Sequence, residues 1–471
     1  MADTIRSISP VTGKCILERQ GSTLEQAKEI VLLSNAAFLQ WRSVPLSERI
    51  VIVTKAMELI HERREELAED LTFQMGRPIR YTVGELNTMQ VRAKYLISIA
   101  ETTLEDTPCD IEQGFKRRIA KVPLGPALLV FAWNYPYLIV VNSLIPALLA
   151  GNSVILKPSP QTPKVGDSLV EIFSKAGLPK NVLSVLHSGS NETLAQIVKL
   201  PDIKLITFTG STAGGHAIRN AVSDRLVPIC LELGGNDPAY VRPDVDLAHV
   251  AGELVDGAVF NSGQSCCSIE RIYVHQDVYD DFVEAVQVEL MTFATPAPQS
   301  SYDFYKTTML GPVISPAAVA NIHAHIADAL AKGAKDVTPN NPSFTDLPKT
   351  GSFIAPVVLT NTTHRMRVMM EETFGPVIPI MKVANDEEAI KLMNDSDYGL
   401  TASIWTKDIA KGEELIEQLE AGTVFVNRAD FPNADLAWTG WKNSGLGVTL
   451  GPFGFNGFFK LKSYHVKESQ T

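Results

Sequence analysis

Short apolar runs alternate with helix-length amphipathic segments from about residue 117 to residue 427 of the chain. Runs such as RIAKVPLG, PALLVFAW, NSVILKP and KLITFTGS are rich in aliphatic and β-branched residues, and segments such as TPKVGDSLVEIFSKAG separate them. This alternation predicts buried parallel strands joined by helices, which is an α/β architecture. Because the pattern restarts after LELGG, we expect two parallel α/β layers, one before and one after Glu232.

The rest of the chain follows other patterns. Residues 24–102 carry apolar residues at three-and-four spacing, which predicts an opening layer of helices. A chain of 471 residues is longer than a single core normally supports, so more than one domain is expected. Residues 106–122 and 457–468 are alternating and polar, and they are interpreted either as ordinary surface strands or as edge strands that pair across subunits. Residues 295–305 are expected to form a surface connection.

Composition excludes several classes of function. The net charge of −11 argues against a nucleic-acid partner, because proteins that neutralise phosphates carry a basic excess. The five cysteines lack C-x-x-C spacing, which favours neither a disulfide framework nor a zinc site and fits a reducing compartment such as the cytoplasm. The start of the chain shows no leader pattern. The apolar stretch 126–156 contains three prolines and is interpreted as buried strand and helix rather than a membrane span.

Polar or Gly-rich segments follow several of the predicted strands, and the carboxyl ends of parallel strands are where α/β folds place ligands. Asn134 in FAWNYP is either a turn asparagine or a donor to a developing oxyanion. Lys157 in ILKPSPQTP is either solvated or in reach of a nucleotide. FTGSTAGG lies between a strand and a predicted helix, where backbone N–H groups can hold phosphate, but it matches neither G-x-G-x-x-G nor a P-loop.

Two further residues stand out for their chemistry. Glu232 ends the apolar run ICLEL, where a carboxylate is costly unless its pKa rises, and that is the profile of a general base. Cys266 follows Gly263-Gln264, and we expect a tight turn that exposes the sulfur near a helix start and favours the thiolate. The structural alternatives are a capped glutamate and a buried cysteine.

Glu232 and Cys266 are 34 residues apart, and this pairing of LELGG with GQSC resembles the signature of the aldehyde dehydrogenase superfamily. The resemblance covers nearly the whole chain. Its other segments, in the order of the family, are SPVTGK, WNYP, LKPSPQTP, PDIKLITFTGS, MEETFGPV, DYGLTASIWT, TVFVN and GWKNSGLG. It implies two Rossmann-like parallel α/β domains, one for the cofactor and one for catalysis, with a small β oligomerisation or bridging element.

The resemblance also implies a mechanism. Cys266 attacks an aldehyde carbonyl, and the oxyanion of the thiohemiacetal is held by the side chain of Asn134 and the backbone N–H of Cys266. Hydride passes to a nicotinamide, and the remaining thioester is hydrolysed by water with Glu232 as general base. Relatives that transfer the acyl group to coenzyme A generally lack that glutamate, so a non-acylating enzyme is implied.

The family pattern assigns NAD or NADP to one set of residues: Trp133, Lys157, Ser159, Pro160, Gly210, Ser211, Gly215, Leu233, Gly234, Glu372 and Phe374. In this family the glycine pattern is G-x-x-x-x-G, which Gly210 and Gly215 satisfy. Many NAD-preferring members carry a glutamate where this chain has Pro160. Without that carboxylate nothing would repel a 2′-phosphate, so NADP use is compatible with the sequence.

The expected substrate tunnel comprises Tyr135, Asn142, Ser265, Cys267, Arg428, Phe431 and Trp438. This set suits a medium-sized or aromatic aldehyde. Arg428 is interpreted either as a reader of a carboxylate-bearing semialdehyde or as a salt-bridged structural arginine. AWTGWKNSGLGVT departs from the family pattern at Trp438, Thr439 and Val448-Thr449, which affects the substrate entrance and nearby subunit contacts. None of the histidines falls at a catalytic position of the family, so no metal site is expected.

The resemblance assigns roles to the parts of the chain. Residues 1–103 and 125–231 would form the NAD(P)-binding domain and residues 232–427 the catalytic domain. Residues 104–124 and 428–471 would form bridging, oligomerisation and substrate-entrance segments. The expected partners are a small aldehyde and further copies of the chain, as a homodimer or homotetramer, with no nucleic acid and no membrane. A catalytically idle cofactor-binding scaffold and a thiol esterase are the alternative functions.

Overall fold

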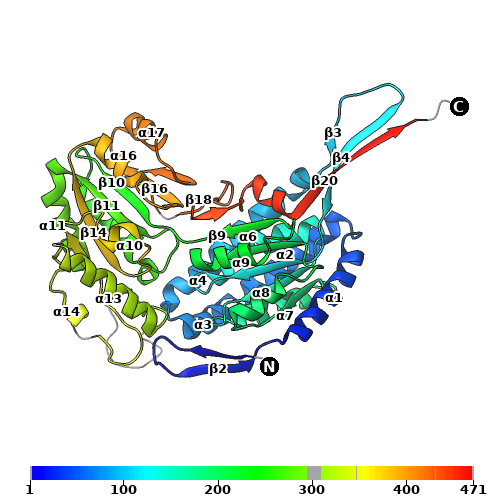
Figure 1. The fold of residues 1–471 in the computed structure, drawn as a ribbon, viewed down its shortest axis with the longest axis horizontal. Helices are drawn as coiled ribbons and strands as arrows, with labels where there is room; N and C mark the ends of the chain where they lie inside the picture. Colours follow the sequence, from blue (N-terminus) through cyan, green and yellow to red (C-terminus); the bar gives the residue numbers. More distant parts are fainter. Residues whose placement is uncertain (1–2, 294–308, 346, 430, 469–471) are drawn as a thin grey trace.

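The computed structural model describes residues 3–293, 309–345, 347–429 and 431–468 (Figure 1). The surface connection predicted at residues 295–305 lies outside these ranges. Figure 1 shows the chain as two lobes, each built on a sheet with helices packed against it, and a narrow arm that projects from one end. The two sheets confirm the α/β class predicted from the alternating pattern.

The first sheet contains six strands within the described residues, in the order β19-β9-β8-β5-β6-β7. Its strands are β5 (Ala127–Phe131), β6 (Val154–Pro158), β7 (Leu183–Val185), β8 (Leu205–Thr209), β9 (Ile229–Glu232) and β19 (Gly445–Leu446). The pairs among β5 to β9 are parallel, and β5 and β6 are buried along their whole length, as two-sided helix cover requires. The short β19 comes from near the end of the chain and pairs antiparallel with β9, an addition that the strand pattern did not predict.

Helices of the amino-terminal half surround the first sheet, some contacting its strands and others packing on those helices, and residues 24–102 are largely helical as predicted. They are α1 (Leu24–Trp41), α2 (Leu46–Glu62), α3 (Arg64–Met75), α4 (Ile79–Ser98), α5 (Ala100–Leu104), α6 (Pro136–Ala150), α7 (Lys164–Lys175), α8 (Asn191–Ile197) and α9 (Thr212–Ala221). Thr23 begins α1 with a capping box that includes Gln26. The apolar stretch 126–156 forms buried β5, α6 and the start of β6, and no described helix is long and apolar enough to cross a bilayer.

The second sheet contains seven strands within the described ranges, in the order β12-β13-β14-β11-β10-β16-β17. They are β10 (Asp237–Val241), β11 (Ile269–His275), β12 (Lys335–Asp336), β13 (Val357–Thr360), β14 (Val377–Val383), β16 (Thr401–Trp405) and β17 (Thr423–Val426). Its main helices are α10 (Leu247–Val259), α11 (Tyr279–Leu290), α13 (Pro316–Ala331), α16 (Asp386–Asn394) and α17 (Ile409–Ile416), with short α14 (Pro342–Thr345) and α15 (Arg367–Met370). The sheet changes between Glu232 and Asp237, where the restart of the pattern placed it.

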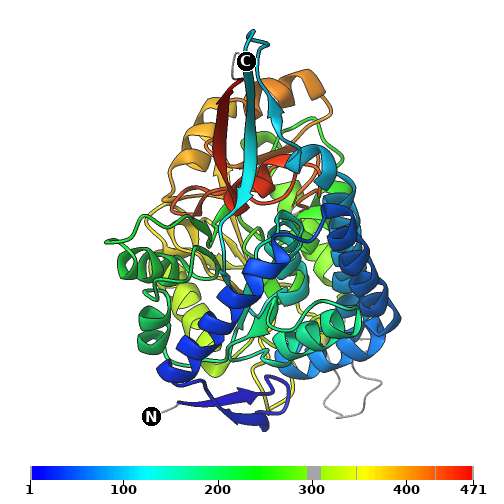
Figure 2. The same cartoon turned by 90° about the vertical axis from the view of Figure 1, so that its right-hand side faces the viewer.

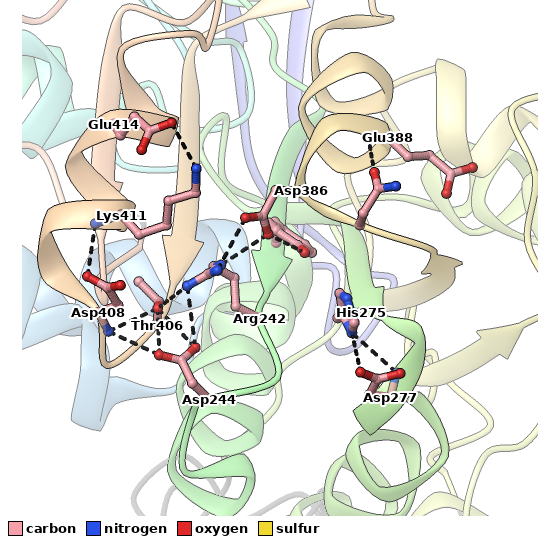
Figure 3. A network of polar contacts seen from close by, with 12 residues as sticks. Arg242, Asp244, His275, Asp277, Asp386, Glu388, Thr406, Asp408, Lys411 and Glu414 are labelled. Carbon is pink, nitrogen blue, oxygen red and sulfur yellow. Dashed lines mark hydrogen bonds and ion pairs between the residues drawn. The ribbon is translucent and has the colours of Figure 1, made fainter.

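A polar network occupies the carboxyl edge of the second sheet (Figure 3). Arg242, directly after β10, donates through Nε to Asp386 Oδ1 at 3.0 Å and through Nη1 to Thr406 Oγ1 at 3.0 Å. Thr406 follows β16 and donates to Asp244 Oδ2 at 2.8 Å. These contacts tie β10, β16 and the start of α16 together, so the polar groups at this edge have partners from the protein itself.

The projecting arm is a separate sheet of β3 (Thr107–Pro108), β4 (Phe115–Pro123) and β20 (Phe459–Lys467), in the order β20-β4-β3 (Figures 1 and 2). β4 pairs antiparallel with β20 over its full length. The inclusion of RIAKVPLG among the parallel runs is therefore wrong. Most residues of β4 are exposed or half-buried, as expected for a strand outside a two-sided core. Two small pairs complete the fold: β1 (Thr4–Ile8) with β2 (Cys15–Gln20), and β15 (Tyr398–Gly399) with β18 (Trp441–Lys442).

Candidate active site

Two cavities meet at Cys266. The larger, of about 380 Å³, is walled mainly by α4, α6 and the segments around Cys266 and Phe431. The smaller, of about 300 Å³, is walled by the ends of β5 and β8 and by the segments after β9 and before β14. Asn134, Ile139, Thr209 and Cys266 line both. The carboxyl edge of the first sheet therefore faces the amino edge of the second sheet across this site.

The turn before Cys266 is fixed by its backbone. Asn261, Ser262 and Gly263 have positive φ values of 53°, 59° and 72°. A Cβ on Gly263 would lie 2.3 Å from the carbonyl oxygen of Gly375, so only glycine fits there. The side chain of Gln264 holds the turn by donating to the carbonyls of Asn261 at 3.0 Å and Pro312 at 3.3 Å. This confirms the predicted tight turn and explains the Gly263-Gln264 pair.

Two expectations for Cys266 are wrong. The sulfur does not lie near a helix start, because Cys266 follows the 3-10 turn Phe260–Gly263 and precedes β11. Its thiolate is also not favoured in the free protein. The hydrogen bond with Cys267, burial, and the nearby charges of Asp237 and Glu232 raise the pKa of Cys266 well above its usual value. Cys266 must therefore lose its proton before it can attack, and none of the five cysteines forms a disulfide.

Asn134 is 4% exposed and donates from Nδ2 to the carbonyl of Gln264 at 3.2 Å. Its own carbonyl accepts a hydrogen bond from Arg77. Arg77 forms a fully buried ion pair with Glu85 at 2.5 Å, and Glu85 accepts the N–H groups of Tyr137 at 2.8 Å and Leu138 at 3.2 Å at the start of α6. The buried pair thus holds both the backbone of Asn134 and the helix that follows it.

Glu232 ends β9 and lies in the wall of the larger cavity. Its carboxylate accepts hydrogen bonds from the hydroxyls of Thr449 and, at 3.3 Å, Thr209. Burial raises the pKa of Glu232, and the two hydroxyls together with the charge of Arg92 oppose that rise. A buried carboxyl with a raised pKa is suited to accept a proton near neutral pH.

The smaller cavity collects most of the predicted cofactor residues: Trp133, Gly210, Ser211, Leu233, Gly234, Glu372 and Phe374. The rings of Trp133 and Phe374 meet edge to face, with their centroids 5.8 Å apart. Burial and the charge of Glu270 raise the pKa of Glu372 to about 8, and the N–H of Gly235 donates to it at 3.1 Å. A Cβ on Gly234 would lie 2.4 Å from that carboxylate. The cavity thus offers aromatic faces, bare backbone and one carboxyl.

The other predicted cofactor residues lie outside the lining of this cavity. Lys157, at the end of β6, is 7% exposed, so the solvated alternative is wrong. Burial lowers the pKa of Lys157 to about 8. Ser159 Oγ accepts the N–H of Gln161 at 3.2 Å in the loop that also contains Pro160. Gly215 packs against Leu233, which leaves no room for a Cβ.

The larger cavity brings together six of the predicted substrate residues: Tyr135, Asn142, Ser265, Cys267, Phe431 and Trp438. Arg428 is not among its lining residues. It is exposed, and its guanidinium lies 4.2 Å from the centroid of the Phe431 ring.

The structure adds residues that the sequence reading did not find. Thr209 and Thr449 bind Glu232, and α4 contributes Glu85 and Arg92 to the cavity wall. A signal for the last two was available, because they are seven residues apart on one face of α4, beside the apolar stripe that contains Leu86, Met89 and Ala93. Thr449 lies in the segment where the chain departs from the family pattern.

Comparison with known proteins agrees with this geometry. The model of the aldehyde dehydrogenase family matches residues 1–464. A 3,6-anhydro-alpha-L-galactose dehydrogenase from Streptomyces coelicolor is 31% identical over 466 residues, covering 99% of this chain and 94% of the relative. A succinate-semialdehyde dehydrogenase [NADP(+)] from Deinococcus radiodurans is 32% identical over 462 residues, covering 97% and 93%.

Among solved structures, betaine aldehyde dehydrogenase from Staphylococcus aureus in complex with NAD+ superposes with a TM-score of 0.92 at 28% identity, covering 100% of this chain and 93% of that one. The fold match therefore extends over both lobes and the arm. With the family model matching nearly the whole chain, this protein belongs to the aldehyde dehydrogenase family.

Proposed function

We propose that the protein oxidises an aldehyde to the carboxylic acid with Cys266 as nucleophile and NAD or NADP as oxidant. The observation that carries this proposal is the position of Cys266 and Asn134 where the two cavities meet, with Glu232 in the wall of the larger. An aldehyde in the larger cavity and a nicotinamide in the smaller would both reach the sulfur.

The first step is addition of the Cys266 sulfur to the carbonyl carbon. The thiol proton, which the raised pKa of Cys266 retains in the free protein, must first leave to solvent. The oxyanion of the thiohemiacetal is held by the amide of Asn134, which turns from its contact with Gln264, and by the N–H of Cys266. Loss of hydride from this carbon leaves a thioester on Cys266.

The second step is hydrolysis of the thioester. Glu232 takes a proton from the attacking water, and the hydroxyls of Thr209 and Thr449 hold its carboxylate in place. The C–S bond breaks, the acid leaves and Cys266 is restored. This use of Glu232 supports a non-acylating reaction that ends in the free acid.

The smaller cavity fits a nicotinamide nucleotide. Gly210, Ser211 and Gly234 let backbone approach a ligand, Trp133 and Phe374 flank the space, and Glu372 can accept from ribose hydroxyls. NAD or NADP, when bound there, supplies the hydride acceptor. Pro160 carries no carboxylate that would repel a 2′-phosphate, and the Deinococcus relative named for NADP supports use of that cofactor.

The larger cavity supports a medium-sized or aromatic aldehyde, because Tyr135, Phe431 and Trp438 supply aromatic wall. A second candidate is a carboxylate-bearing aldehyde. It is supported by the name of the Deinococcus relative and by the buried Arg92 in the same wall. Arg428, which does not line the cavity, gives that candidate no support.

The roles of the larger parts follow from the same proposal. Residues 1–103 and 125–231 would hold the cofactor, and residues 232–427 would present Cys266. Residues 104–124 and 428–471 would bridge copies of the chain in a homodimer or homotetramer. The arm carries exposed apolar side chains at Leu461 and Val466, which a second copy could cover. Five cysteines without a disulfide fit a location in the cytoplasm.

The test is a kinetic panel of aldehydes with NAD and NADP, followed by the absorbance of the reduced nicotinamide, with light scattering for the assembly. We expect turnover with at least one aldehyde and release of the acid. Tight cofactor binding without turnover across the panel would favour an idle scaffold. Ester cleavage without aldehyde oxidation would favour a thiol esterase.

A further inference from the structure

Arg92 is a buried cation in the wall of the larger cavity. It lies on α4 and is 5% exposed. Its Nη1 donates to the carbonyl of Leu138 at 3.3 Å and to Asn142 Oδ1 at 3.2 Å, and its Nη2 donates to the carbonyl of Pro432 at 3.2 Å. Its Nε is buried and has no hydrogen-bond partner in the described part of the chain.

These contacts leave part of the donor capacity of the guanidinium unused within the described residues. An arginine carries five N–H groups in a planar fork, with a single one on Nε and a pair on each Nη. Both N–H groups of Nη1 and one of Nη2 have acceptors, so one on Nε and one on Nη2 remain. Nε and an adjacent Nη form the edge that binds a carboxylate through two parallel hydrogen bonds.

No carboxylate of the protein meets this edge within the described residues. The cavity's other buried arginine, Arg77, forms an ion pair with Glu85 at 2.5 Å, whereas the three acceptors of Arg92 are all neutral oxygens. Burial lowers the pKa of Arg92 to about 10, and the charges of Glu232, Cys267 and Cys266 oppose that fall. The guanidinium therefore remains charged at neutral pH, and an unpaired buried charge favours an anionic partner.

Asn142 strengthens the preference for an acceptor. Because Arg92 has only donors, the side-chain oxygen of Asn142 faces it, and the amide NH₂ of Asn142 is left as a further donor at the cavity wall. The neighbouring wall residues Tyr135, Leu138 and Trp438 are largely apolar. A ligand end that carries oxyanion oxygens would satisfy the donors that the protein leaves open here.

We propose that Arg92 determines substrate specificity by binding a carboxylate at the end of the aldehyde remote from the carbonyl, with Asn142 holding its guanidinium. This proposal rests on the proposed function, because it places the substrate's carbonyl at Cys266. A different role for the same charge would be to act on Cys266 and Glu232 directly. That role would change the rate for every aldehyde by the same factor. Comparing charged with neutral aldehydes therefore distinguishes it from carboxylate binding.

The experiment measures kcat/KM of wild type, Arg92→Met and Arg92→Lys for 4-oxobutanoate, its methyl ester and butanal. We expect wild type to prefer the carboxylate over its neutral ester, and Arg92→Met to lower that preference by about 100-fold through loss of the carboxylate. Arg92→Lys should restore part of the preference, because it keeps the charge but not the two-pronged geometry. The ratio of two substrates on one sample does not depend on the fraction of folded enzyme.

Arg49→Met is the matched control. Arg49 is also buried, has an unpartnered Nε, and has a pKa lowered by burial to about 10, but it does not line the cavity. Arg49→Met should leave the ratio of kcat/KM for 4-oxobutanoate to that for its methyl ester unchanged, even if it lowers stability. An equal loss on charged and neutral aldehydes in Arg92→Met, or no carboxylate preference in wild type, would overturn the inference while the proposed function stands. No oxidation of any aldehyde by wild type would overturn the proposed function itself.

Discussion

The carboxyl edges of the two sheets differ in how their polar side chains are paired. At the second sheet, Arg242 pairs with Asp386 at 3.0 Å and lies 3.8 Å from Asp244, and Thr406 joins them (Figure 3). At the first sheet, Glu232 receives two hydroxyl hydrogen bonds, and it lines a cavity. Both edges are places where α/β folds can bind ligands, but the charged groups named at the second sheet pair with one another, whereas Glu232 lines a cavity.

The electrostatic consequences are opposite. Burial opposes ionisation of Asp386, yet hydrogen bonds from Arg242 and Tyr240 lower its pKa overall. At the site, burial dominates and raises the pKa of Glu232 and, to about 8, that of Glu372. At the second edge the fold thus stabilises the ionised form of Asp386. At the site it favours the protonated form of Glu232 and Glu372, so these carboxyls can exchange a proton near neutral pH. The comparison indicates that the functional edge is the one where a buried carboxyl, Glu232, has no ion-pair partner as close as that of Asp386.

Cys266→Ala removes the group at which the two cavities meet. We expect a loss of aldehyde oxidation of at least about 1,000-fold, because no other thiol at this position can form the acyl intermediate. Steady-state assays with matched circular dichroism would measure it. Cys109→Ala, outside both cavities, is the control. Substantial activity in Cys266→Ala would remove the assignment of the nucleophile.

Thr449→Val should shift the pH dependence of the reaction. A hydrogen bond donated to a carboxylate lowers its pKa, so its loss should raise the pKa of Glu232 further and move the acid limb of kcat up by about one pH unit. At pH 6.5 this corresponds to a loss of up to about 10-fold. Thr406→Val, which removes a comparable bond to Asp244 at the second sheet, is the control and should leave the profile in place. Identical profiles for all three proteins would contradict the assigned base.

Asp386→Asn should lower stability without affecting catalysis. Since the folded-state pKa of Asp386 is depressed, its stabilisation is present above the unfolded pKa and is lost as pH falls through the folded pKa. We expect the free energy of unfolding at pH 7 to fall by about 1 to 2 kcal/mol, a value reduced because Asp386 is partly exposed to solvent. The difference from wild type should vanish at low pH. Urea titrations at several pH values measure this. If Asp386→Asn instead lowered kcat/KM and left stability unchanged, the second edge would be functional rather than structural.

Glu372→Gln should change stability less than Asp386→Asn does, and it should raise stability rather than lower it. A carboxyl whose folded pKa is raised to about 8 contributes stability that is complete below its unfolded pKa and is lost as pH rises toward 8. The amide avoids that loss, so the variant should be more stable than wild type by about 1 kcal/mol at pH 8 and similar to it at pH 4. Its KM for the cofactor should rise. A destabilised variant at pH 8 would show that the carboxyl is paired after all.

Much of the fold was predictable from local patterns. Helices in residues 24–102, the buried strand–helix–strand of residues 126–156 and the sheet change after Glu232 follow from periodicity. Residues 118–125 were misread, because an apolar run gives no sign of whether its strand pairs in parallel or with a distant segment such as β20. Likewise, nothing local showed that β19 adds to the first sheet.

The site was predictable where a residue ends a strand or belongs to a family motif. Asn134 and Glu232 stand at strand ends of the first sheet, and Cys266 was found through its motif. The position of Cys266 at the amino edge of the second sheet was missed, because strand-end reasoning considers one sheet at a time. Arg92 was missed because charged residues on helices are usually solvated, although its spacing from Glu85 beside the apolar stripe of α4 was a signal; its packing against α6 shows that it is buried.

Mass spectrometry of Glu232→Gln, after mixing with an aldehyde substrate and cofactor, tests the roles of Cys266 and Glu232 together. Without the base, addition and hydride loss should outpace hydrolysis, so the acyl group should accumulate on the peptide that contains Cys266, with about one reduced nicotinamide formed per site. Wild type should show little adduct at the same time point. An adduct on Cys267, or full turnover by Glu232→Gln with no adduct, would contradict the assignment of the site.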